Sequence, residues 1–161
     1  MIYKTSLDNL AKGITIGVTI LFAGIIIGQY SIIKDAGHAA PFYTAITCLL
    51  IYLLAFAFRP VNYVVTKDEL IVGRPLLNVH IKRGDIKSVA LLEKDKIRGT
   101  IRTFGVGGLF GYYGNFANFS LGRMTWYATR RDKPVLVKTI DNKNIIFTPN
   151  DPEKFVEELI S

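Results

Sequence analysis

The sequence is poor in the residues from which most catalytic and metal sites are built. It contains one cysteine, Cys48, and two histidines, His38 and His80, among 161 residues. A single cysteine excludes a disulfide scaffold, and neither histidine has a Cys, Asp or Glu at metal-ligand spacing. The GxSxG and HExxH motifs are also missing. We therefore expect a protein that is not an enzyme and that has no metal and no cofactor.

Charge is nearly absent from the first third of the chain. Residues 1–58 contain only five charged side chains: Lys4, Asp8, Lys12, Lys34 and Asp35. The rest of the chain is charged and basic, and the whole has a formal net charge of +7 with a mean hydropathy of +0.29. This division excludes a uniform soluble globule, and the many apolar side chains exclude a disordered chain. We expect an N-terminal tail and membrane segment over residues 1–58 and a separate domain over residues 59–161.

Two uncharged runs in residues 1–58 are long enough to cross a bilayer. They cover residues 13–33 and 39–58, and a hydrocarbon core of ~30 Å needs about 20 helical residues. A core helix of a soluble protein seldom runs this long without a polar face. A signal peptide is the alternative for the first run, but that run is too long for one and a second run follows it. We expect a two-helix transmembrane hairpin.

Lysine and arginine lie mostly on one side of this hairpin. Lys4 and Lys12 precede the first run, and Arg59 follows the second. The connection between the runs carries only Lys34, which Asp35 balances. Because positive residues gather on the cytoplasmic side of a membrane, we expect both termini in the cytoplasm and the connection over residues 34–40 outside.

A stripe of small residues follows one face of the first run. Its members are Gly13, Gly17, Gly24 and Gly28. Their spacing places them on one helix face, and small residues let helices approach closely. We expect the stripe to pack against the second run, and a homodimer through Gly24 and Gly28 is the alternative.

From residue 59 onward the apolar pattern alternates, as it does in β-strands. We expect seven strands, over residues 61–66, 70–72, 79–82, 86–92, 123–129, 135–140 and 144–148. An amphipathic helix follows, with Pro152 in its first turn. The sequence therefore predicts a mainly-β domain, an antiparallel and partly open barrel or sandwich with one C-terminal α-helix.

This order of elements resembles the pleckstrin-homology (PH) superfold. Three stretches are similar to a family of bacterial PH-like domains: RTFGVGGLFGYYGNF at 102–116, YAT at 127–129 and TPNDPEKF at 148–155. The resemblance covers residues 59–161. It implies a domain that follows one or two membrane helices, here in the inner membrane of a bacterium, and it implies no particular activity.

A long segment rich in glycine and aromatic residues separates the fourth and fifth predicted strands. We expect a loop over residues 99–122, with six candidate contact residues: Phe104, Leu109, Phe110, Tyr112, Tyr113 and Phe116. The glycines match neither a P-loop nor the GxGxxG fingerprint of dinucleotide-binding proteins. Three hypotheses remain for the aromatic side chains. They enter the membrane interface, they bind a protein partner, or they pack on the domain's own core.

Strand direction places several basic residues near the membrane. The first predicted strand begins there, so in an antiparallel meander the turn after the second strand and the start of the loop lie at the same pole. We expect four arginines at this basic membrane pole: Arg59, Arg74, Arg98 and Arg102. Arg130 and Arg131 fall at the opposite pole. Basic side chains near an anionic leaflet are stabilising.

These observations favour a non-enzymatic, membrane-anchored interaction module. We expect it to bind a membrane-protein partner through the loop at 99–122. The alternative is peripheral sensing of anionic lipid head groups by the same loop and its flanking arginines. A basic domain also suits nucleic acid, but a membrane tether explains the charge more simply, so we expect no nucleic-acid partner.

Overall fold

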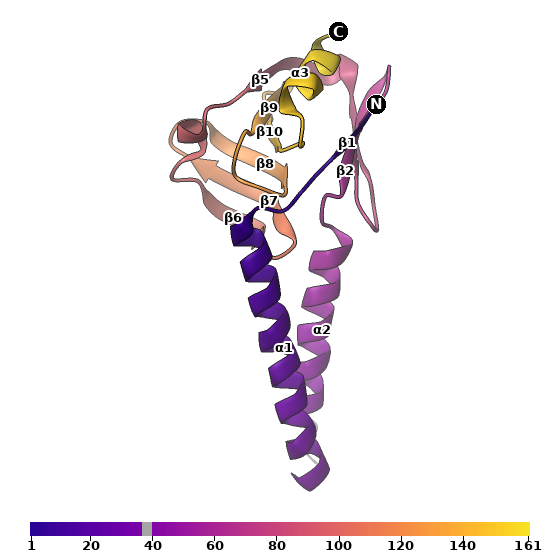
Figure 1. Cartoon of the computed structure of the whole chain (residues 1–161), viewed down its shortest axis with the longest axis vertical. Coiled ribbons are helices and arrows are strands. Elements are labelled where there is room, and N and C mark those ends of the chain that lie inside the picture. Colours follow the sequence, from indigo (N-terminus) through magenta and orange to yellow (C-terminus); the bar gives the residue numbers. More distant parts are fainter. Residues whose placement is uncertain (37–39) are drawn as a thin grey trace.

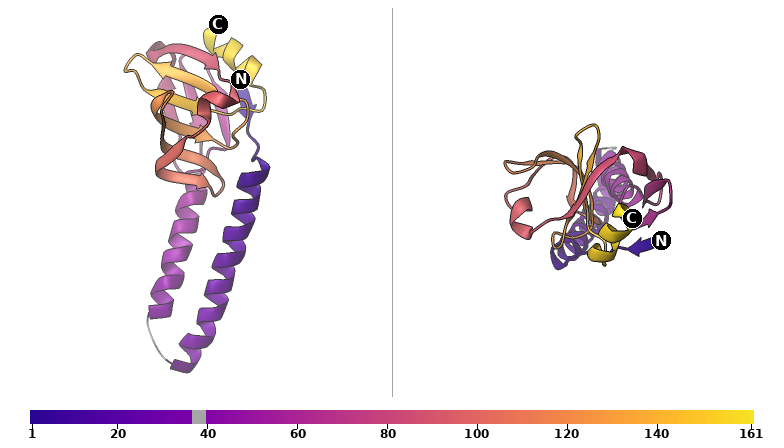
Figure 2. Two further views of the ribbon diagram at one scale, coloured as in Figure 1. Left: turned by 90° about the vertical axis from the view of Figure 1, so that its left-hand side faces the viewer. Right: turned by 90° about the horizontal axis from the view of Figure 1, so that it is seen from above.

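Figure 1 shows the computed structural model of the chain, in which a β-rich domain lies at one end of two long helices. The structure describes residues 1–36 and 40–161, and the side chains of residues 1–30 and 41–161. Helix α1 covers Asn9–Ala36 and helix α2 covers Ala40–Ala57, and the two lie side by side (Figures 1 and 2). The connection that we expected to face outward includes residues 37–39, which lie outside the described residues.

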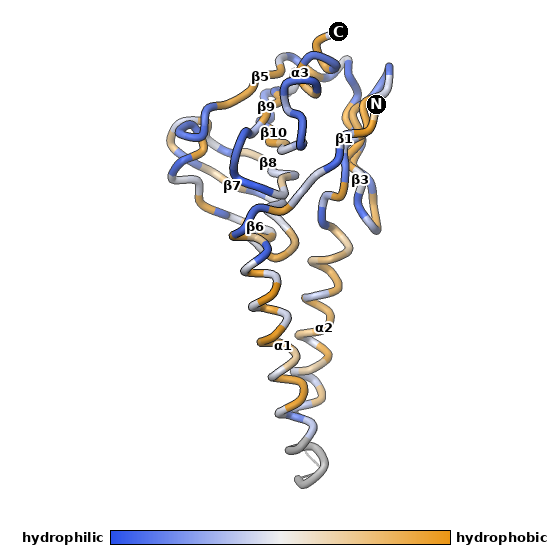
Figure 3. The backbone as a smooth tube through the Cα atoms, viewed as in Figure 1, coloured by the Kyte–Doolittle hydropathy of each residue, from blue (hydrophilic) through white to orange (hydrophobic). Residues whose placement is uncertain are grey.

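One of these helices is long and apolar enough to cross a membrane. The segment Asn9–Tyr30 of α1 has a mean hydropathy of 2.2, and the apolar part of α2, Pro41–Ala57, is shorter. Hydrophobic residues follow both helices, whereas hydrophilic residues gather in the domain (Figure 3). Large apolar side chains on both helices, such as Ile27 and Leu50, are exposed. The hydrocarbon core of a bilayer would cover this exposed apolar surface.

The two helices meet through a face of α1 that excludes the glycine stripe. Thr19 Oγ1 lies 2.9 Å from Tyr52 Oη, and the rings of Phe22 and Tyr52 are 6.3 Å apart. Among the described residues, nothing packs within 4 Å of the Cβ position of four glycines: Gly13, Gly17, Gly24 and Gly28. The expected packing of this stripe on the second run is therefore wrong, because at about 100° per residue the stripe lies nearly opposite Thr19 and Phe22. The homodimer through Gly24 and Gly28 stays a prediction.

The first sheet contains a strand from the extreme N-terminus. Its four antiparallel strands follow the order β1 (Ile2–Lys4), β2 (Asn62–Val65), β3 (Glu69–Gly73) and β4 (Val79–Lys82). Tyr3 of β1 stands opposite Tyr63 of β2, and the terminal ammonium donates to the Val65 carbonyl. The expected boundary at residue 58 is therefore wrong for the N-terminal tail, which is part of the β domain. A strand of three residues is too short to show alternation in sequence.

The second sheet contains the segment that we expected to be a loop. Its strand order is β5 (Ile86–Leu91), β9 (Val135–Thr139), β10 (Asn144–Phe147), β8 (Gly122–Ala128), β7 (Gly111–Asn118) and β6 (Ile101–Gly108). Neighbouring strands are antiparallel except β10 and β8, which are parallel. The described residues thus form ten strands in two sheets rather than seven. The C-terminal helix α3 (Pro152–Ile160) lies where the sequence placed it.

At its centre, in β9 and β10, the six-stranded sheet is buried on both faces. One face shares a core with the four-stranded sheet and α3, including Tyr63, Phe147 and Phe155. The other face packs around Trp126 and receives Ala11 from the start of α1. Burial on both faces explains why β9 and β10 are continuous apolar runs rather than alternating ones.

Candidate functional site

Two facing glycines determine the shape of the β6–β7 hairpin. Gly105 pairs with Gly114 across the strands, and their φ angles are +108° and +117°. A Cβ on Gly105 would overlap the carbonyl oxygen of Tyr113, and one on Gly114 would overlap that of Phe104. Only glycine fits both the backbone angle and the space. The glycines that suggested a loop therefore allow two strands to approach closely.

The tip of this hairpin docks on the chain's own helices. The ring of Phe110 packs edge-on against Tyr52 of α2, with centroids 5.1 Å apart. The Phe110 backbone N–H donates to Thr15 Oγ1 of α1 at 2.9 Å, and the Tyr113 hydroxyl donates to the Ala55 carbonyl of α2. Burial raises the pKa of Tyr113. The tip thus fastens the β domain to both helices.

Two of the candidate loop residues lie inside the domain. Tyr112 and Phe116 are 0% and 1% exposed, and Phe116 stacks on Trp126 with ring centroids 4.8 Å apart. The Tyr112 hydroxyl donates to the Asp8 carboxylate, whose oxygens lie 3.1 and 3.2 Å away. Burial and then the charge of Asp8 raise the pKa of Tyr112 to about 12. The expectation that these two residues contact a partner is wrong, because strand alternation turns both toward the core.

An open groove of about 960 Å³ lies between the hairpin and the helices. Of the candidate loop residues, Phe104, Leu109 and Tyr113 line it. Phe104 is 75% exposed, whereas Leu109 is half-buried and Tyr113 is buried. The helices contribute mostly aliphatic side chains to the lining: Ile14, Val18, Ile51, Leu54 and Ala55. The groove is therefore mostly apolar and continues onto the helices.

Two arginines, Arg74 and Arg102, line this groove. None of the described lining residues is acidic. Arg74 belongs to the turn between β3 and β4, and its guanidinium carbon lies 5.4 Å from the ring centroid of Phe58 and 5.9 Å from that of Tyr127. Its Nε donates to the Leu77 carbonyl. Arg102 is exposed on β6. The fixed charge of the groove is therefore positive.

The four arginines of the expected membrane pole do not all lie together in the structure. Arg74 and Arg102 line the groove, and Arg59 lies beside it with its guanidinium carbon 4.2 Å from the Phe56 ring centroid. Arg98 lies elsewhere and lines a separate cavity.

The position of the β3–β4 turn is confirmed. The backbone N–H of Leu76 in this turn donates to the carbonyl of Ala57, the last residue of α2, at 3.0 Å. The antiparallel meander therefore returns the chain to the helix end, as the sequence predicted.

Arg131 was expected far from the membrane, but it lies beside the start of α1. Asp8 caps α1 by accepting from the Ala11 backbone N–H at 2.7 Å. The same carboxylate accepts from the Arg131 backbone N–H at 3.1 Å, and the Arg131 guanidinium carbon lies 4.7 Å from the Tyr112 ring centroid. The expectation failed because the N-terminal tail, placed in the membrane segment by sequence, runs along the domain.

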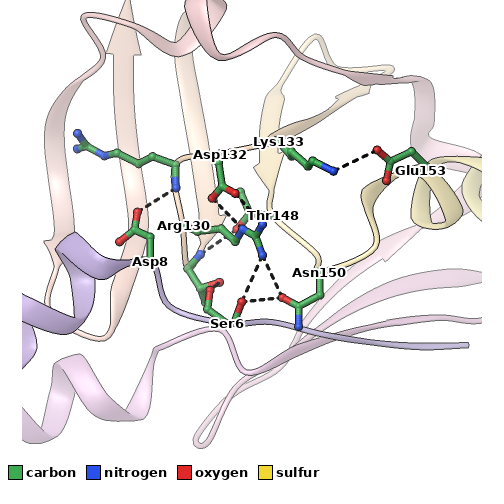
Figure 4. A network of polar contacts seen from close by, with 10 residues as sticks. Ser6, Asp8, Arg130, Asp132, Lys133, Thr148, Asn150 and Glu153 are labelled. Carbon is green, nitrogen blue, oxygen red and sulfur yellow. Dashed lines mark hydrogen bonds and ion pairs between the residues drawn. The ribbon is translucent and has the colours of Figure 1, made fainter.

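Arg130 belongs to the same junction (Figure 4). It donates to both carboxylate oxygens of Asp132 at 2.8 and 2.7 Å, and it reaches Ser6 Oγ and Asn150 Oδ1 at 3.3 Å. The hydrogen bonds from Arg130 lower the pKa of Asp132. This network ties the segment before α1 to the turn between β8 and β9.

Comparison with known proteins identifies the β domain. A family model described as "Bacterial PH domain" matches residues 61–161. The chain belongs to the bacterial PH domain family. No curated protein and no solved structure matches it. The matched part of the PH domain runs from β2 to α3, so β1 and both helices are additions outside it.

Sequence reasoning found part of the groove of this PH domain. Arg74, Arg102 and Phe104 were singled out by charge or composition, whereas Val18 and Leu54 were seen only as membrane-span residues. Their place in the groove depends on how α1 and α2 meet the hairpin, for which a single sequence gives no signal. Among the described residues, no group of three or more His, Cys, Asp or Glu side chains is placed to hold a metal ion.

Proposed function

We propose that this chain is a membrane-anchored PH domain that binds an anionic phospholipid in the groove between its helices and the β6–β7 hairpin. One observation carries the proposal. Arg74 and Arg102 line an apolar groove that continues onto α1 and α2, and no described acidic side chain offsets their charge.

We propose that both helices cross the inner membrane of a bacterium as a hairpin. Helix α2 has 18 residues, which at about 1.5 Å per residue approaches the ~30 Å of the hydrocarbon core. The lysines and arginines flanking the hairpin favour a cytoplasmic location for both termini and the PH domain. The groove then lies at the inner membrane surface.

The chemistry of the groove suits one anionic phospholipid. A lipid phosphate between Arg74 and Arg102 would accept charge-assisted hydrogen bonds, which are stronger than neutral ones. An acyl chain would lie against Val18 and Leu54, where it needs no access to water. The groove volume of about 960 Å³ lies in the range of small-molecule sites, roughly 300–1,000 Å³. The proposed function is binding alone, without a chemical step.

Native mass spectrometry tests this function. The full chain, exchanged into a mixture of phosphatidylglycerol and phosphatidylcholine, should retain phosphatidylglycerol preferentially. The variant Arg74→Gln/Arg102→Gln should lose this preference by about tenfold or more, since two charge-assisted contacts are removed. The matched control Arg123→Gln/Lys138→Gln removes two exposed charges outside the groove. Equal retention by the wild type and the groove variant would contradict the proposal.

A protein partner is the second candidate, and the edge of β6 favours it. Strand β6 pairs with β7 on one side and ends the sheet on the other. Ile101 and Phe104 on this strand are 65% and 75% exposed. An open edge can accept an extended strand from another protein. Photo-crosslinking in cells through position 104, with the exposed Phe119 as the control position, should then capture a partner at 104 alone.

A further inference from the structure

A second cavity lies on the other face of β8 from the groove. Thr125 and Tyr127 line the groove, whereas Trp126, between them, lines a cavity of about 450 Å³. The short 3-10 helix η2 (Lys94–Ile97) and residues 98–100 supply much of the remaining wall. Because strand side chains alternate in direction, the two cavities are separated by the sheet. They share no lining residue.

The walls of this cavity are basic. Lys94, Arg98 and Arg131 line it, against the single described carboxylate of Asp95, so two positive charges are in excess. An adjoining cavity of about 460 Å³ shares Lys94 and Arg131. The carboxylates of that neighbour, Asp8 and Asp132, are held by hydrogen bonds from within the chain.

Trp126, which lines the cavity, has a buried hydrogen-bond donor without an acceptor. Trp126 is 1% exposed, and its indole Nε1 has no hydrogen-bond partner among the described residues. Native proteins pair nearly all buried N–H groups, and each exception calls for an explanation. An acceptor supplied by a bound ligand would remove the cost of leaving this group unpaired.

We propose that this cavity is a binding site for a phosphate monoester. A phosphate oxygen accepts from Trp126 Nε1, and Lys94, Arg98 and Arg131 neutralise the charge. A phosphate monoester carries about −1.5 to −2 at neutral pH, which matches the excess charge, and its three acceptor oxygens can accept from the tryptophan and the basic side chains. A cavity of about 450 Å³ is large enough for a small phosphorylated molecule or for the head group of phosphatidic acid. This site is independent of the groove.

Fluorescence tests the proposal directly, because Trp126 is the only tryptophan in the chain. The full chain in phosphatidylcholine nanodiscs is titrated with glycerol 3-phosphate and with inorganic phosphate, and sodium chloride at matched ionic strength serves as the blank. We expect a saturable change in emission. In a parallel arm, phosphatidic acid is added to the nanodisc without a soluble ligand. A change in only one arm identifies a soluble or a lipid source, and either supports the site.

Two variants and a control decide whether the signal comes from this cavity. Lys94→Gln/Arg98→Gln should weaken the apparent affinity about tenfold or more, since two charged contacts are lost. Lys82→Gln/Lys87→Gln, which removes two exposed charges outside the cavity, should leave it unchanged. Trp126→Phe, followed by calorimetry, should also weaken binding about tenfold through loss of one N–H donor. If that variant does not fold, the Lys94/Arg98 pair decides.

Either of two results would overturn the proposal. No saturable emission change with any of the three probes, or a change that Lys94→Gln/Arg98→Gln leaves intact, would exclude a phosphate site here. The groove variant Arg74→Gln/Arg102→Gln should bind the soluble probes like the wild type. The two sites can therefore fail or succeed separately.

Discussion

The two ends of the β6–β7 hairpin have similar residues in opposite environments. At the tip, Phe110 and Tyr113 are buried against α1 and α2. At the open end, Ile101 and Phe104 are 65% and 75% exposed. The difference arises because α1 and α2 dock on the tip of the hairpin. An aromatic segment near a membrane is thus not by itself a contact surface, because the chain's own helices can occupy it.

Removing the aromatic ring at the tip should have the largest effect on stability. Phe110→Ala leaves a cavity between the hairpin and α2 and should cost about 3–5 kcal/mol of unfolding free energy. Phe104→Ala removes the same ring from the exposed end and should stay within about 0.5 kcal/mol. Thermal unfolding in detergent micelles measures both. Similar losses in the two variants would remove the distinction between the ends of the hairpin.

Disturbing the close approach of β6 and β7 should have the next largest effect on stability. Gly105→Ala forces a side chain into a positive-φ position against the backbone of β7, and we expect a loss of roughly 2–3 kcal/mol. Gly84→Ala is the matched control, since the space around Gly84 is open, and it should change stability by less than about 1 kcal/mol. Urea titrations of the same preparations compare the two. A Gly105→Ala midpoint equal to that of the control would argue against the hairpin.

Removing the hydrogen bond between β7 and the start of α1 should cause a smaller but measurable loss of stability. Tyr112→Phe deletes the hydroxyl that donates to Asp8 and should cost about 1.5–3 kcal/mol, the range for hydrogen bonds to charged groups. Asp8 keeps its backbone donors from Ala11 and Arg131, which places the expected value at the lower end. Chemical unfolding provides the number, and an unchanged midpoint would show that this hydrogen bond adds nothing.

The stability of the protein at alkaline pH should also depend on Tyr112. The pKa of Tyr112 and that of Tyr63 are both raised to about 12, first of all by burial. A raised pKa means that the folded state holds its proton more tightly than the unfolded state, whose phenol titrates near 10. Stability should therefore be constant with respect to these groups below about pH 10 and fall as the pH rises toward 12. The fall should be smaller in Tyr112→Phe, and a wild type equally stable at pH 8 and pH 11.5 would contradict this.

Alternation and short apolar runs made most of the PH domain predictable. Each of the seven expected strands has a counterpart in the structure, and so does the C-terminal helix. The hairpin was missed because glycines such as Gly105 and Gly114 interrupt the apolar alternation that signals a strand. The groove was found only in part, through its arginines and hairpin residues such as Phe104, since its aliphatic lining from the helices depends on contacts between distant segments. The orphaned N–H of Trp126 could not be predicted, because hydrogen-bond partners depend on the folded environment.

The central claim is that the groove holds an anionic phospholipid. A phosphatidylglycerol with a photoreactive group on its acyl chain, incorporated with the full chain in vesicles, tests it most directly. We expect labelling at Val18 and Leu54, which line the groove, to exceed the background labelling by bulk lipid at the exposed Ile16 and Ile20, on the opposite side of α1. The labelling at Val18 and Leu54 should disappear in Arg74→Gln/Arg102→Gln. Labelling spread evenly around α1, or unaffected by loss of the two arginines, would contradict the account.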